Sequence, residues 1–246
     1  MNNTMNRSKI QWLYDACNLI FTQEEPPTFQ KIQWLKKLID TMEAIDVGID
    51  EFKTDESLTR WARKSSVEDC EGLICGQGVS EITYIHIYES NFFSIGVFCF
   101  PAGAKLPLHD HPSMTVLSKL LYGSVYVKAY DWVKVEKSNY RTVGLAAKVI
   151  DGIIKAPSEA TVLFPKNGGN IHSFTALTPC AILDVLSPPY SDDLGRPSTY
   201  FSEIFVPSLR GYAILEERDL PDDLVVTGAP YLGPRLITSD DSDEFS

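Results

Sequence analysis

The feature that most constrains the fold is a series of short strand-like segments that begins near Glu81. Turn-forming residues, such as Gly123 and the pair Gly168 and Gly169, separate most neighbouring segments. Short strands at this spacing are typical of a sandwich, a jelly roll or a barrel. We expect strands over 82–88, 92–100, 114–122, 124–133, 146–150, 160–164, 173–177, 181–186, 200–206 and 212–216. The chain is therefore predicted to be all-β over most of its length.

Helical periodicity is confined to the N-terminal part. Apolar residues recur at helical spacing over 7–22 and over 29–44, and a shorter helical pattern covers 56–63. Thr28 follows two prolines and is a suitable N-cap for the second helix. The amphipathic stripes predict that these helices pack against the outside of the β region.

The pattern divides the chain into three parts. A glycine-containing linker over 67–78 leads into the β region, and a segment rich in Pro and Asp over 219–232 is expected to wrap its surface. A run of acidic residues at the C-terminus predicts a disordered end. The parts are an N-terminal helical extension (1–66), a single β domain (67–238) and an acidic tail (239–246).

Composition excludes several classes of partner. The net charge of −11 argues against direct nucleic-acid binding, which depends on Lys and Arg. The chain lacks an apolar run long enough for a membrane span, and its N-terminus lacks the order of a signal peptide.

The five cysteines are odd in number and scattered, as thiols in a reducing compartment would be. We expect a monomer in the cytoplasm, with the nucleus as a second location.

Two of the four histidines, His109 and His111, are separated by a single residue. In an extended strand, side chains at i and i+2 point to the same face, so both imidazoles can bind one metal ion. Gly103, six residues before His109, and Gly123, twelve after His111, suit turns at the ends of flanking strands. This spacing resembles the first cupin motif, except that Val116 stands where the motif has a glutamate ligand.

A third ligand must then come from elsewhere in the chain. His172 follows a glycine-rich turn, with Gly169 three residues before it, and this arrangement resembles the second cupin motif. We therefore predict a three-histidine metal site of His109, His111 and His172. The fourth histidine, His86, lies in a strand-like run without such neighbours and is interpreted as a surface or core residue.

Three imidazoles without a carboxylate leave several metals open. Zinc would act as a Lewis acid or produce hydroxide, whereas ferrous iron could activate dioxygen. With Val116 in place of a carboxylate, the ion would keep its full double charge and attract an anionic thiolate. The alternatives to an iron site that activates dioxygen are a ligand-binding cupin without catalytic activity and a zinc-dependent isomerase or hydrolase.

Two further residues are candidates for chemistry. Asp184 lies in the apolar run 181–186, where an unpaired buried carboxylate is costly. It could fix a loop, orient a histidine or hold a substrate ammonium group. Tyr190 follows Pro188 and Pro189 and could direct its hydroxyl into the same cavity, or it could be a packed aromatic.

Three segments carry a resemblance to a known family: FPAGAKLPLHDHPSMTVLSKLLYGSVYVKAYDW, FPKNGGNIHSFTALTPCAILDVLSPPY and GRPSTYF. They resemble the plant cysteine oxidases, which are relatives of animal cysteamine dioxygenase. The resemblance implies a cupin fold, that is, a double-stranded β-helix or jelly-roll barrel, and Fe(II) held by His109, His111 and His172. It also implies that Asp184 and Tyr190 take part in substrate handling.

The same resemblance implies a reaction and its substrates. The expected reaction uses O2 to convert the N-terminal cysteine of a protein, notably an ethylene-response transcription factor, to cysteine sulfinic acid. The product would feed the N-degron pathway, so that the enzyme acts as an oxygen sensor in the hypoxia response. Several relatives carry a cysteine where this chain has Ser198, so a cysteine–tyrosine crosslink involving Tyr200 is not expected here.

Overall fold

The computed structural model describes residues 7–50, 80–137 and 141–238. The helix expected over 56–63, the linker over 67–78 with Cys70 and Cys75, and the acidic tail over 239–246 lie outside these residues. The described part of the chain contains no helix with both the length and the apolar character needed to cross a membrane.

Two helices form the N-terminal layer, α1 (Lys9–Phe21) and α2 (Phe29–Asp40), followed by the short 3-10 helix η1 (Ala44–Val47). The predicted cap is confirmed, because Thr28 Oγ1 accepts a hydrogen bond of 3.3 Å from the backbone N–H of Lys31. The second helix ends at Asp40, earlier than the predicted end at residue 44, and η1 begins only at Ala44.

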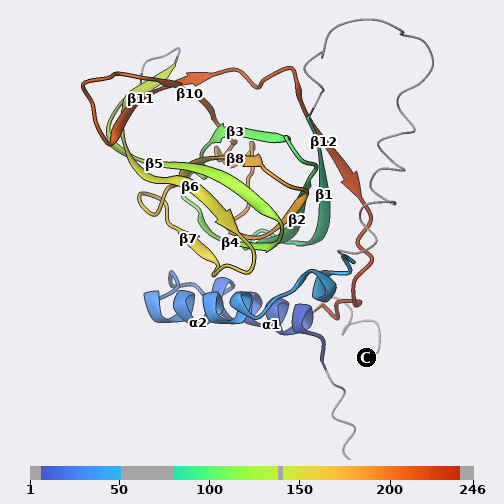
Figure 1. The fold of residues 1–246 in the computed structure, drawn as a ribbon. Helices are drawn as coiled ribbons and strands as arrows, with labels where there is room; N and C mark the ends of the chain where they lie inside the picture. The colour runs from blue at the N-terminus through green and yellow to red at the C-terminus, as the bar shows by residue number, and fades with distance from the viewer. Residues whose placement is uncertain (1–6, 51–79, 138–140, 239–246) are drawn as a thin grey trace, which may run out of the picture.

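The strands form two sheets that enclose the interior (Figure 1). The first sheet is six-stranded and has the order β12 (Leu224–Ala229), β1 (Ser80–Glu89), β2 (Ser94–Phe100), β9 (Cys180–Ser187), β4 (Thr115–Tyr122), β7 (Thr161–Leu163). The second closes on itself in the order β10 (Tyr200–Ile204), β11 (Tyr212–Arg218), β6 (Thr142–Lys155), β5 (Ser124–Lys137), β8 (Ile171–Ala176), β3 (Lys105–His109). The predicted all-β cupin architecture is confirmed.

Side chains of β9 alternate between the two faces of the first sheet and pack into two different hydrophobic clusters. Leu183 and Val185 are fully buried against the helices, in a cluster that includes Leu35 of α2. Ile182 faces the opposite side and packs between the two sheets. Because successive residues of a strand point to opposite faces, Asp184 shares the inner face with Ile182. In Figure 1 the helices lie side by side beneath the barrel, next to β4, as the amphipathic pattern predicts.

Several strands differ from the sequence prediction, among them β6 (Thr142–Lys155), where a strand was expected only over 146–150. Strand β12 lies within the segment that was expected to wrap the surface, and it pairs in parallel with β1, which it follows in Figure 1. Strand β3 ends at His109, so the extended strand predicted through His111 is wrong at its last two residues. A proline, Pro112, and Ser113 with a positive φ of 59° end the strand and turn the chain at this point.

Candidate metal centre

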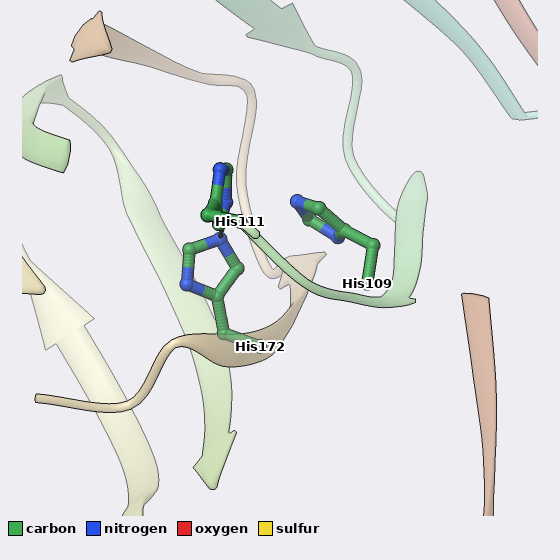
Figure 2. Close-up of side chains that lie close together, drawn as sticks. All are labelled: His109, His111 and His172. Carbon is green, nitrogen blue, oxygen red and sulfur yellow. Dashed lines mark hydrogen bonds between the residues drawn. The ribbon is translucent and has the colours of Figure 1, made fainter. Parts of the chain in front are cut away.

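The structure brings the three predicted histidines together (Figure 2). His109 is the last residue of β3 and lies opposite His172 of β8 in the antiparallel register. His111 is in the loop that follows, and its ring points toward the other two. One ligand nitrogen from each residue lies within 4.8 Å of the others. His86 is exposed on β1 and lies outside this group.

Hydrogen bonds to neighbouring groups fix which nitrogen of each ring is free. His109 Nδ1 donates to the carbonyl oxygen of Pro107 at 2.8 Å, which leaves Nε2 with its lone pair. Tyr190 donates its hydroxyl hydrogen to the carbonyl oxygen of Asp110 at 2.7 Å, so its oxygen accepts from His111 Nδ1 at 2.7 Å. A backbone hydrogen bond with Gly169 restrains His172. Such contacts set the tautomer and orientation of metal-binding imidazoles.

The three imidazoles are held in the neutral form that metals require. Burial lowers the pKa of His109 to about 4, although the Pro107 carbonyl raises it in part. Burial also lowers the pKa of His111 well below its usual value, with further lowering by His172 and His109. Burial and the neighbouring His109 also lower the pKa of His172 well below its usual value, although the hydrogen bond with Gly169 raises it in part. All three rings are therefore neutral at physiological pH.

The donor set suits a divalent metal ion. His111 Nε2 and His172 Nε2 are 3.2 Å apart. Two metal–nitrogen bonds of about 2.1 Å at an angle of roughly 100° would place their nitrogens about 3.2 Å apart. Val116 is 1% exposed and packs with Met114 and Leu163. Among the described residues the ligand group therefore contains three histidines and no carboxylate.

A cavity of about 180 Å³ opens beside the histidines. Its lining comes from both sheets and is mostly apolar, including Phe98, Phe100, Phe174 and Ile182. This volume is smaller than that of most small-molecule pockets, so the cavity suits a small group or the end of a longer molecule.

Asp184 supplies a carboxyl group to this cavity. It is 9% exposed, and its Oδ1 has no hydrogen-bond partner among the described residues. Burial raises the pKa of Asp184 from 3.8 to about 7, while the Ser118 side chain, opposite it in the β4–β9 register, lowers the pKa in part. The carboxyl can therefore gain or lose a proton near neutral pH.

Tyr190 also lines the cavity, and its hydroxyl forms a hydrogen bond with His111. Burial raises the pKa of its phenol well above 10, so the hydroxyl keeps its proton, and the Ser198 side chain lowers the pKa in part. Tyr200 pairs with His109 across β10 and β3, and the two ring centroids are 6.3 Å apart. The segment with Ser198 thus lies next to the site.

The sequence analysis missed several residues of the site. Tyr84 and Glu89 on β1 line the cavity together with the histidines. Tyr84 gave a weak signal as an aromatic residue in a predicted strand. Asn170 bonds to the backbone of His111 and was recognised only as part of a turn. Its position, two residues before His172, was the available signal.

The fold and the site define a cupin whose barrel contains a three-histidine group that could bind a metal ion. The sequence model of the PCO_ADO family matches residues 38–236, and the chain belongs to this family of thiol dioxygenases. Plant cysteine oxidase 1 from Arabidopsis thaliana is 38% identical over 246 aligned residues, which cover 92% of this chain and 80% of that protein. The expected family resemblance is confirmed.

Similarity was also found to a further curated protein and to a solved structure. The protein named 2-aminoethanethiol dioxygenase from Homo sapiens is 32% identical over 187 aligned residues, covering 63% of this chain and 68% of that protein. Among solved structures, an RmlC-like cupin from Desulfovibrio desulfuricans is 20% identical with a TM-score of 0.31, covering 50% of this chain and 99% of that chain.

Proposed function

We propose that this protein is an Fe(II)-dependent dioxygenase that converts the N-terminal cysteine of target proteins to cysteine sulfinic acid. The observation that carries the proposal is the convergence of three neutral imidazoles on a small, mostly apolar cavity. The name of the Arabidopsis relative, plant cysteine oxidase, supports a cysteine thiol as substrate. Ethylene-response transcription factors and an oxygen-sensing role in the N-degron pathway form part of the proposal through the family resemblance.

Fe(II) bound by His109, His111 and His172 would supply the redox chemistry that O2 needs to react with a thiol. The reaction balances without a further reductant, because one thiol and one O2 give one sulfinic acid, with both oxygen atoms on sulfur. The protein positions the thiol beside the metal site, and apolar residues such as Phe98 and Phe174 exclude water from it.

Asp184 is assigned to the substrate's α-amino group. Asp184 lines the cavity from β9, one of its oxygens has no partner among the described residues, and an ammonium group would satisfy it. A carboxyl whose pKa is about 7 can also accept the proton released when a thiol becomes a thiolate. Asp184 therefore acts as a catalytic residue that binds the amine or moves a proton.

Tyr190 acts on the metal centre and the cavity together. Its hydroxyl holds the proton-bearing Nδ1 of His111, so that Nε2 faces the other ligands. The phenol keeps its own proton and closes one side of the cavity. The small cavity favours entry of only the first residue of a protein, with the rest of the polypeptide outside. We place this activity in the cytoplasm and nucleus, on a monomeric enzyme.

The test combines metal analysis with turnover of a defined peptide. The purified protein should contain iron and should add two oxygen atoms to a peptide that begins with cysteine, with matching consumption of O2. The same peptide with an acetylated N-terminus should react poorly, because Asp184 would lose its cationic partner. Zinc without O2 consumption would favour an isomerase or hydrolase, and no bound metal would favour a non-catalytic cupin; either result would overturn the proposal.

A further inference from the structure

The backbone of His111 is held by a side chain outside the ligand group. Because His111 lies beyond the end of β3, no strand ladder fixes its peptide groups, although its carbonyl oxygen also accepts a turn hydrogen bond of 3.2 Å from the backbone N–H of Met114. Its backbone N–H donates to Asn170 Oδ1 at 3.0 Å, and its carbonyl oxygen accepts from Asn170 Nδ2 at 2.9 Å. The amide of Asn170 thus acts as a strand partner would, bonding both polar backbone groups of one residue.

The Asn170 amide uses both of its hydrogens at this position. It is 8% exposed, and Nδ2 makes a further hydrogen bond of 3.0 Å to the carbonyl oxygen of Phe164. A carboxamide supplies a donor and an acceptor from one rigid plane, which neither a carboxylate nor a hydrocarbon can do. The site therefore requires the chemistry of asparagine as well as its size.

Asn170 is itself fixed to the barrel wall by Asp131 of β5. Asp131 Oδ1 accepts hydrogen bonds from the backbone N–H groups of Gly169 at 2.9 Å and Asn170 at 3.0 Å. Gly169 has a φ of +86°, and an added Cβ would lie 2.7 Å from the Cβ of Ala129. The turn is thus pressed against β5. A continuous set of bonds runs from β5 through this turn to the loop that carries His111.

We propose that Asn170, supported by Asp131, is a positioning residue of the metal centre. It ties the loop of His111 to the start of β8, where His172 is the second residue. The spacing of these two ligands therefore depends on the amide. The inference rests on the proposed metal-dependent function but assigns a role that the ligand set itself does not include. Loss of a hydrogen bond that orients a metal-binding residue lowers metal affinity by about 10–100-fold.

The test measures binding of Co²⁺ to metal-free full-length protein by titration and by visible absorption. Asn170→Ala removes all three side-chain hydrogen bonds, and Asn170→Asp keeps the acceptor but loses the donor. Both variants should bind Co²⁺ about 10–100-fold more weakly than wild type and give altered spectra. The matched control is Thr178→Ala, which removes a side-chain bond of 2.9 Å to the backbone of Ser124 in another turn. This control should keep wild-type affinity.

Variants of Asp131 keep the proposal testable if the Asn170 variants fail to fold. Asp131→Asn retains an acceptor oxygen and should bind Co²⁺ nearly as wild type does, whereas Asp131→Ala should bind it more weakly. Wild-type affinity and spectra in folded Asn170 variants, or an equal loss in Thr178→Ala, would overturn the positioning role. Failure of the wild-type protein to bind Co²⁺ would instead reject the metal site, and with it the proposed function.

Discussion

Replacing Asp184 by Asn should stabilise the metal-free protein increasingly as pH rises. Asp184 is 9% exposed, and its pKa rises from 3.8 to about 7 on folding. Because the folded state binds this proton more tightly than the unfolded state, folding stability falls as pH increases from below 4 to above 7. The asparagine variant has no such proton and should not show this loss.

The pKa difference sets the expected magnitude. At 1.36 kcal/mol per pKa unit, the raised pKa of Asp184 costs about 2 kcal/mol of stability at pH 5, where folding takes up a proton, and about 4 kcal/mol at pH 8, where most of the folded carboxyl is ionised. The stability of Asp184→Asn relative to wild type should therefore increase by about 2–3 kcal/mol between these two pH values. Any constant cost of burying the amide cancels in this comparison.

Urea unfolding at a series of pH values measures this difference. The protein must be free of metal, because a nearby divalent ion would itself lower the carboxyl pKa. Asp222→Asn is the control, since Asp222 is exposed and its carboxylate remains in water. Parallel stability curves for wild type and Asp184→Asn would refute the reasoning. The folded variant should also turn over peptide slowly, and an unchanged rate would mean that Asp184 has only a structural role.

Three further substitutions test separate parts of the structure. His172→Asp should lose most activity even if iron is retained, because a carboxylate changes the charge at the ion; unchanged turnover, assayed with the cysteine peptide, would contradict this. Tyr190→Phe should weaken Co²⁺ binding about 10-fold, since His111 Nδ1 loses its partner; wild-type affinity in the titration would remove Tyr190 from the centre. Leu35→Ala should cost about 2–5 kcal/mol of stability in urea unfolding, because Leu35 of α2 is fully buried against the sheet. The Co²⁺ affinity of this variant should not change. A weaker affinity would show that the helical layer controls the site.

Local patterns in the sequence were sufficient to predict most of the barrel and the three histidines that come together in it. The glycine-rich turn before His172 and the pairing of His109 with His111 each depend on neighbouring residues, so they could be recognised without the fold. The departure from the first cupin motif, in which Val116 stands in place of the glutamate, was visible in the same way. The end of β3 at His109 was not predicted, because the turn at Ser113 adopts a positive φ that the sequence pattern did not indicate.

Contacts between distant segments could not be read from local patterns. The parallel pairing of β12 with β1 joins residues that are far apart in the chain, and the Pro- and Asp-rich composition of that region favoured a loop. The sequence also left the role of Asp184 open. Its unpartnered oxygen and its place in the cavity depend on which strands lie beside β9.

The amino-acid sequence by itself determined most of the strand succession, the three histidines of the candidate metal centre and the family, because these depend on residue types at short, regular spacings. Only the tertiary structure decided how the ligands meet. The β3–β8 register places His109 opposite His172, and the Asn170 amide and Tyr190 hydroxyl hold His111 beside them. These bonds join groups that become neighbours only when the sheets close, so their geometry belongs to the folded barrel.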